Sequence, residues 1–187
     1  MQSLSDNELM RQVQQGQVEQ LGPLFERHHV KLFNFFLRLT GQRAVSEDLV
    51  QDVFFRMLKY RKSFAARRPF RPWMYQVARN ALMDQRHRSN GCSPEEESNA
   101  AEDMPSQEPT PDFQVMRGQE LELLQEALAR LPLEKREVLV LSRLQNLRCE
   151  EIAAIVRCEV GAVRVRIHRA LQDLKAIVSQ LLEGKPL

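Results

Sequence analysis

Hydrophobic positions near the C-terminus recur at helical spacing in two consecutive segments. The first segment predicts a helix over 149–156, with Ile152 and Ile155 facing inward. Residues 157–160 form a predicted turn, and Gly161 opens a second helix. Each residue lies about 100° further round a helix, which places the apolar residues of the second one on a single face. That face comprises Val163, Ile167, Ala170, Leu171 and Leu174. The pattern predicts a helix-turn-helix.

The other side of this second helix is mostly basic and polar. It carries Arg164, Val165, Arg166, His168, Arg169 and Gln172. A helix with a buried stripe and an outward basic face suits the major groove of DNA. The same pattern also fits an ordinary amphipathic helix with a solvated face, and the pattern alone does not separate the two readings.

The N-terminal half is predicted to be helical by the same periodicity. A capping box at 5–8 begins the first helix, and Gly16 ends it. A second helix is expected over 18–39, stopped by Gly41, and a third over 45–60. Their expected core residues are Leu21, Leu24, Phe25, Leu32, Phe35, Phe36, Leu49, Val50, Val53 and Met57. On the third helix, the same angular count places Gln51, Asp52 and Phe55 outward, which suggests a docking surface, although single exposed apolar residues are common.

A fourth helix is expected after Pro72 and as far as about Arg88. Its predicted apolar side consists of Val77, Ala78, Ala81 and Leu82. The polar side carries Gln76, Arg79, Asn80, Met83 and Arg86, with Trp73 at its boundary and Tyr75 near the apolar side. Aromatic residues beside a basic, hydrogen-bonding helix fit single-stranded DNA, because unpaired bases stack on rings. Trp73 as an anchor in the core is an alternative of at least equal weight.

The charge is distributed unevenly along the 187 residues. Residues 1–88 carry a net charge of +7, residues 89–118 carry −6 and residues 119–187 carry +1. The segment 89–112 is rich in Ser, Pro, Glu and Asn and poor in apolar residues, so it is predicted to be a flexible linker. Beyond it, helices are expected over 119–131 and 133–144. The expected fold is therefore all-α, with two small helical domains joined by a flexible acidic linker.

Composition excludes several classes of protein. No apolar run approaches the roughly 20 residues of a membrane helix, and the polar N-terminus is unlike a signal peptide, so a cytoplasmic protein is expected. The three cysteines, Cys92, Cys149 and Cys158, form no CxxC motif, so neither a disulfide framework nor a metal site is indicated. Because no arrangement of catalytic residues stands out, we expect no enzyme and no cofactor.

Three stretches together resemble bacterial RNA polymerase sigma factors of the extracytoplasmic-function (ECF) type. SEDLVQDVFFRML resembles the helix that docks on the polymerase clamp, and FRPWMYQVARNALMDQRHR resembles the helix that melts and reads the −10 element. The stretch from LPLEKREVLVL to RVRIHRAL resembles the domain that reads the −35 element. This chain departs from the usual pattern at Ala162, Val165 and Leu147-Arg148, which bears on the promoter sequence rather than on the role.

The resemblance implies domains at 1–88 and 119–187, joined by a linker over 89–118. It further implies core RNA polymerase, promoter DNA and an anti-sigma factor as partners, with no membrane insertion. Polymerase binding would fall to Asp48, Gln51, Asp52 and Phe55. The residues that would contact the −10 element are Trp73, Gln76, Arg79, Asn80, Met83 and Arg86. Those that would contact the −35 element are Arg164, Val165, Arg166, His168, Arg169 and Gln172. The alternative function is a free-standing helix-turn-helix regulator.

Overall fold

The computed structural model describes residues 4–65, 67–91 and 111–184, and every regular element in those ranges is helical. The N-terminal block contains α1 (Asp6–Gln14), the short helix η1 (Val18–Gln20), α2 (Leu21–Thr40), α3 (Arg43–Lys59), η2 (Arg61–Ser63) and α4 (Phe70–Gly91). The C-terminal block contains α5 (Pro111–Ala129), α6 (Leu133–Leu139), η3 (Val140–Leu144), α7 (Cys149–Val156) and α8 (Val160–Glu183). The expected all-α fold is confirmed.

Helix ends follow local chemistry that is visible in the sequence. The Ser5 backbone N–H donates to Glu8 Oε2 at 2.7 Å, while the Glu8 N–H donates to Ser5 Oγ, so the predicted capping box is formed. Gly41 ends α2 with φ of 72°, a left-handed conformation that glycine adopts without a steric penalty. In α7, the Arg148 N–H donates to Glu151 Oε2, which caps the first helix of the helix-turn-helix.

Several boundaries differ from the sequence prediction. The segment expected as one helix from residue 18 begins as the separate turn η1, and α2 follows it with Pro23 in its first turn, where a missing N–H costs little. The helix expected to begin at Gln119 begins at Pro111, because proline is well suited to the first position of a helix. Because α4 continues to Gly91 and α5 begins at Pro111, helices extend into both ends of the segment predicted as a linker over 89–118. Residues 92–110 of that segment, with Cys92, lie outside the described residues.

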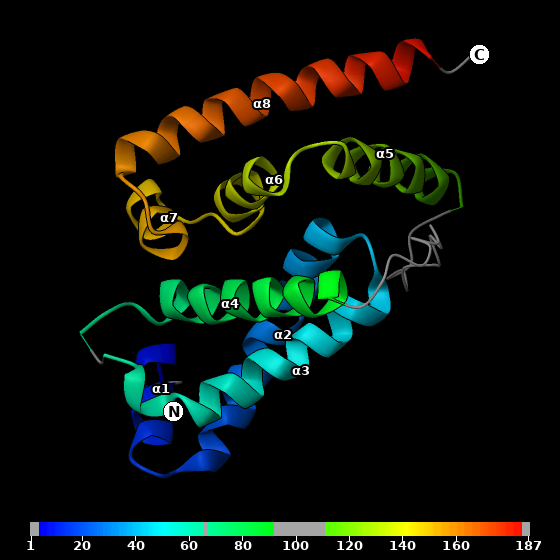
Figure 1. Ribbon diagram of the computed structural model, residues 1–187. Coiled ribbons are helices and arrows are strands. Elements are labelled where there is room, and N and C mark those ends of the chain that lie inside the picture. The colour runs from blue at the N-terminus through cyan, green and yellow to red at the C-terminus, as the bar shows by residue number, and fades with distance from the viewer. Residues whose placement is uncertain (1–3, 66, 92–110, 185–187) are drawn as a thin grey trace.

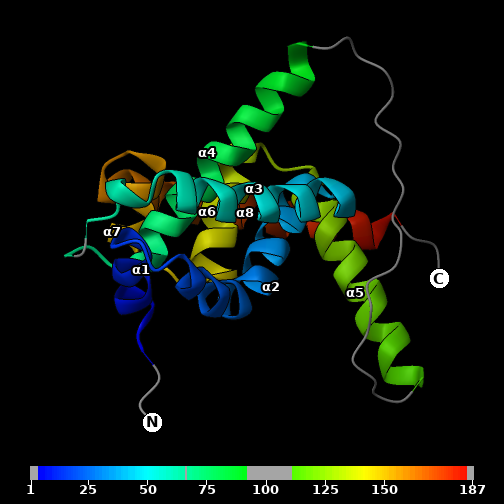
Figure 2. The same ribbon diagram turned by 90° about the horizontal axis from the view of Figure 1, so that it is seen from below.

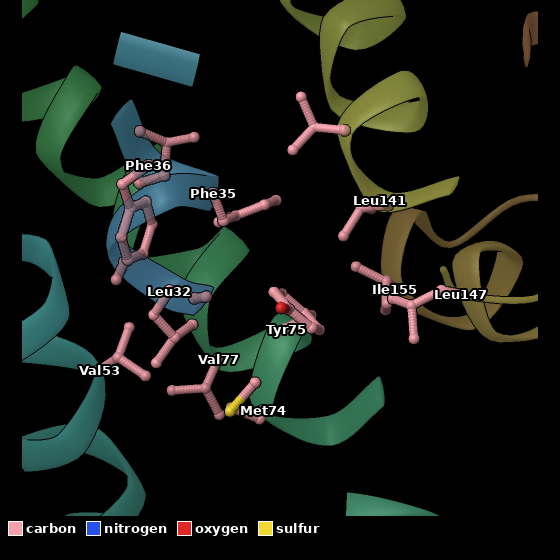
Figure 3. Packing of buried hydrophobic residues seen from close by; sticks show 14 of the residues in the cluster. Leu32, Phe35, Phe36, Val53, Met74, Tyr75, Val77, Leu141, Leu147 and Ile155 are labelled. Atoms are coloured by element: carbon pink, nitrogen blue, oxygen red, sulfur yellow. The ribbon is translucent and has the colours of Figure 1, made fainter. Parts of the chain in front are cut away.

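The two blocks pack against each other. In Figure 1, α4 lies along the side of the N-terminal block that faces α6 and α7, with α8 beyond them, and Figure 2 shows the same stack from below. The buried residues of both blocks form one continuous cluster. Figure 3 shows Tyr75 of α4 between Phe35 on one side and Leu141, Leu147 and Ile155 on the other. Burying a Phe or Leu side chain stabilises a fold by roughly 1.5–3 kcal/mol, so these contacts hold α4 of the N-terminal block against the C-terminal block.

The second helix of the C-terminal block has an irregular end. Where the sequence predicts one helix over 133–144, α6 ends at Leu139 and a π-helical turn, η3, completes the segment. The N–H of Gln145 donates to the Val140 carbonyl at 3.0 Å, and Asn146 has φ of 50°. Such wide turns redirect the residues that follow them. Here the turn leads into Gln145, which is 6% exposed and faces α4.

Candidate docking surface and nucleic-acid interface

The outward face of α3 carries the four residues expected to form a docking surface. Asp48, Gln51 and Phe55 are exposed, and the Phe55 side chain is 65% exposed. Asp52 is half-buried, and its Oδ2 lies 2.9 Å from Arg56 Nε. Because the core side of α3 is occupied by Val50, Val53 and other buried residues, Phe55 has no part in internal packing on that side. The surface combines an apolar ring with carboxylate and amide groups.

The polar side of α4 lies partly open and partly against the C-terminal block. Asn80 and Arg86 are exposed, whereas Gln76, Arg79 and Met83 are half-buried. The expected apolar side, Val77, Ala78, Ala81 and Leu82, is buried, and so is Tyr75. Of the polar side, Arg79 contacts the C-terminal block, since its Nε lies 2.9 Å from Glu137 Oε1 in α6.

Trp73 packs at the edge of the N-terminal core. Its ring meets Phe64 edge-on, with 5.2 Å between the ring centroids, and is tilted against Phe70 at 6.2 Å. The side chain is nevertheless only half-buried, so part of it remains accessible to solvent. Trp73 therefore packs as an anchor at the edge of the core, and its exposed part is also available to a DNA base.

The outward face of α8 is open. Arg164, Val165, His168, Arg169 and Gln172 are exposed, and Arg166 is half-buried. On the opposite face, Val163 and Ala170 are buried while Ile167, Leu171 and Leu174 pack against the core from partly buried positions. The helix-turn-helix prediction therefore matches the structure, with α7 covering 149–156 as expected and α8 beginning one residue before Gly161. Arg164 Nη2 also lies 3.7 Å from Glu150 Oε1 of α7, and this exposed ion pair contributes little to stability.

An open groove of about 490 Å³ runs beside α8. Basic side chains line it, namely Arg143, Arg164, His168 and Lys175. Sequence reasoning missed Arg143 and Lys175 as members of this surface. Lys175 lies three positions after Gln172, so extending the outward helical face by one turn would have included it. Arg143 lies in η3, and only the fold brings it to the groove.

Two residues of the C-terminal block, Glu137 and Gln145, contact α4, and sequence analysis assigned no role to either. The Tyr75 hydroxyl donates to Gln145 Oε1, and Arg71 donates to the Gln145 carbonyl. Burial raises the pKa of Glu137, and the positive charges of Arg79 and Arg166 act in the opposite direction. Glu137 lies four positions from both Leu133 and Leu141, which places it on the apolar face of the helix predicted over 133–144. A carboxylate on an apolar helix face was the signal available in the sequence.

Within the described ranges, no group of three or more His, Cys, Asp or Glu side chains is placed to hold a metal ion. No helix there is both long and apolar enough to cross a membrane.

Comparison with known families identifies both blocks. Residues 24–91 match the Sigma-70 region 2 model, and residues 121–174 match the Sigma-70 region 4 model. The RNA polymerase sigma factor CarQ of Myxococcus xanthus is 30% identical over 176 residues, covering 92% of this chain and 97% of that protein. The ECF RNA polymerase sigma factor SigL of Mycobacterium tuberculosis is 30% identical over 162 residues, covering 84% and 88% of the two chains.

Solved structures have the same fold. The structure of CnrH in complex with the cytosolic domain of CnrY superposes with a TM-score of 0.67 at 25% identity, covering 97% of this chain and 99% of that one. The sigma factor RpoE of Bartonella quintana, in complex with the anti-sigma factor NepR, superposes with a TM-score of 0.68 at 23% identity, covering 84% and 96%. The order of regions 2 and 4 decides against a free-standing helix-turn-helix regulator. The chain belongs to the RNA polymerase sigma factors of the ECF type, which are transcription initiation factors.

Proposed function

We propose that the three surfaces described above divide the work of a sigma factor. The outward face of α3 binds core RNA polymerase, the polar side of α4 contacts the −10 element, and the outward face of α8 contacts the −35 element. The single observation that carries this proposal is the arrangement of exposed faces on region 2 and region 4 of one chain. The protein works in the cytoplasm, where core polymerase and promoter DNA are found.

The α3 surface is suited to a protein partner. Phe55 offers a large exposed ring, and aromatic residues are enriched among those that dominate binding energy at interfaces. Asp48, Gln51 and Asp52 surround it with groups that accept hydrogen bonds and attract basic partners. This mixture of an apolar anchor and a polar rim matches the anatomy of a specific interface.

The α4 surface is suited to unpaired bases. Asn80 and Gln76 can pair with base edges, Arg79 and Arg86 can bind phosphates, and Trp73 and Met83 offer apolar surface for stacking. Promoter opening would then be favoured by trapping a flipped base, without hydrolysis of a nucleotide. No catalytic group is required for this step.

The α8 surface is suited to duplex DNA. Arg164 and Arg169 can each donate two hydrogen bonds to guanine O6 and N7 in the major groove, and Gln172 can pair with adenine. Val165, 49% exposed, can contact the methyl group of thymine. Arg166, His168, Arg143 and Lys175 add positive charge beside the phosphate backbone.

An anti-sigma factor is a further proposed partner. Two solved structures with this fold are complexes, the sigma factor RpoE with the anti-sigma factor NepR and CnrH with the cytosolic domain of CnrY. Because this chain has the same fold and both sigma regions, we propose that an anti-sigma factor binds and restrains it as well.

The proposal is tested by mixing the purified chain with core RNA polymerase in the absence of DNA and measuring co-elution on a sizing column. We expect a stable one-to-one complex without DNA. A chain that binds duplex promoter DNA by itself as a dimer, and leaves core polymerase free, would contradict the proposal.

A further inference from the structure

Glu137 of α6 is a carboxylate buried between the two blocks. It is 2% exposed, and its Oε1 lies 2.9 Å from Arg79 Nε. Among the described residues neither of these two atoms has a hydrogen bond of good geometry, so the contact is an ion pair held by position and charge. A buried carboxylate is costly unless a cation neutralises it. Arg79 supplies that cation, and the same side chain is proposed to contact the −10 element.

Other basic residues with proposed DNA contacts lie around the same point. The charge of Arg166 in α8 acts on Glu137, and Arg86 of α4 acts on Arg136 of α6. Side chains from the proposed −10 surface and the proposed −35 surface therefore surround the interface between the blocks. A face that is turned toward this interface cannot contact DNA at the same time.

Polar contacts extend the interface on both sides of Glu137. Gln145 accepts from Tyr75 and Arg71 and donates to the Lys31 carbonyl. Arg136 Nη1 donates to the Leu39 carbonyl at 2.7 Å, and Gln125 Nε2 donates to the Leu37 carbonyl at 3.0 Å. These bonds tie α5, α6 and the end of η3 to α2 and α4.

We propose that this arrangement is a closed form of the free protein, latched by Glu137, which occupies Arg79 as an internal substitute for a DNA phosphate. The inference rests on the proposed function of the α4 surface. Core polymerase would separate the blocks, and Arg79 would then exchange the carboxylate for nucleic acid. Polar and ionic contacts lie beside the apolar ones in this interface, and an interface between domains that is only partly apolar separates more readily than a core. A buried ion pair of this kind favours one arrangement strongly only while both partners are present.

The test compares four variants of the full chain. Glu137→Arg places a cation among Arg79, Arg136 and Arg166 and should open the protein. Arg79→Glu/Glu137→Arg exchanges the two charges and should close it again. Glu183→Arg is the matched control, because it makes the same charge change at an exposed position near the end of α8. Gln145→Ala weakens the interface without burying a new charge. It replaces Glu137→Arg as the opening variant if Glu137→Arg does not fold.

Two measurements are made on each variant after its helix content is verified by circular dichroism. Small-angle X-ray scattering gives the radius of gyration, and fluorescence anisotropy gives the affinity for a short labelled single-stranded DNA of mixed sequence. If about one molecule in ten is open in the unmodified chain, full opening raises the apparent affinity about tenfold. We expect Glu137→Arg to expand and to gain this affinity, the charge exchange to restore the compact form, and Glu183→Arg to leave the radius unchanged.

The outcomes separate the latch from the function on which it rests. If Glu137→Arg and Gln145→Ala remain as compact as Glu183→Arg, the latch is overturned, while the proposed DNA surfaces stand. If Glu137→Arg expands but binds single-stranded DNA no better than Glu183→Arg, the latch is supported as a conformational contact, and the role given to the α4 surface is overturned.

Discussion

The hydroxyl of Tyr75 in α4 donates a hydrogen bond to the side-chain oxygen of Gln145, 70 positions later in the chain. Burial raises the pKa of this hydroxyl above its ordinary value of 10.0, which keeps it protonated as a donor. Tyr75 lies in region 2, and Gln145 lies in region 4. This single bond therefore joins the two halves of the sigma factor, and it lies in the same interface as the ion pair between Arg79 and Glu137.

The α3 surface is tested by Phe55→Asp. A charge at the centre of an apolar contact must be desolvated, so we expect core polymerase binding to weaken by about 2 kcal/mol or more, measured as a dissociation constant. Val30→Asp is the matched control, since Val30 is also an exposed apolar residue, 55% exposed on α2. Equal binding by the Phe55 and Val30 variants would remove α3 from the interface.

Arg169 is expected to read sequence, because it is exposed on the outward face of α8. Arg169→Ala should cost about 1–3 kcal/mol on the preferred −35 element and relax the preference at one base pair. Lys175→Ala, in the same basic groove, should weaken binding to all −35 variants alike. Holoenzyme binding to a panel of single-base −35 variants measures both effects, and a uniform loss for Arg169→Ala would make it a phosphate contact.

Asn80 is expected to act in strand opening. It is exposed on α4 beside Arg79, where it can pair with an unstacked base. Asn80→Ala should reduce transcription from duplex promoters more than from templates already mismatched at the −10 element, whereas Gln85→Ala, on a different side of α4, should reduce neither. A loss of equal size on both templates would show that Asn80 acts before or independently of opening.

Stability should depend on pH through His28. This side chain is 2% exposed, burial lowers its pKa, and the hydrogen bond to Asp6 opposes that effect only in part. In the unfolded chain His28 takes up a proton near its ordinary value of 6.5, so the unfolded state binds more protons below that pH. The stability that neutral His28 contributes is therefore fully present above about pH 6.5. It is lost as the pH falls toward the lower pKa of His28 in the folded protein.

The measurement is the free energy of unfolding by urea between pH 7.5 and 5, on His28→Gln and on the control His29→Gln. The unmodified chain and the His29 variant should lose stability as the pH falls, and the His28 variant should lose less. An identical slope in all three would mean that His28 does not set this pH dependence.

Local features of the fold were predictable from the sequence, and long-range contacts were not. The capping box at Ser5, the end of α2 at Gly41 and the buried stripe of α8 follow from interactions within a few residues. The start of α5 at Pro111 lies ahead of the predicted start at 119, because proline disfavours the interior of a helix but is well suited to its first turn. The π-helical turn η3 has no local signature, since its geometry depends on packing against α2.

The candidate surfaces were predictable as faces of single helices, but their relationship was not. Helical periodicity placed Phe55, Asn80 and Arg169 on outward faces, and the structure agrees. The contact of Arg79 with Glu137 joins residues far apart in the chain, and no periodic pattern relates them. Such pairs form only when two blocks meet, so they require the structure.

The central claim is that this chain gives core RNA polymerase its promoter specificity. Run-off transcription with purified core polymerase on a library of genomic promoter fragments tests it most directly, because the core enzyme alone initiates without sequence preference. The account predicts that adding the chain produces transcripts from a small set of fragments that share −35 and −10 sequences, with the Phe55→Asp protein producing few. Transcripts that are the same with and without the chain would contradict it.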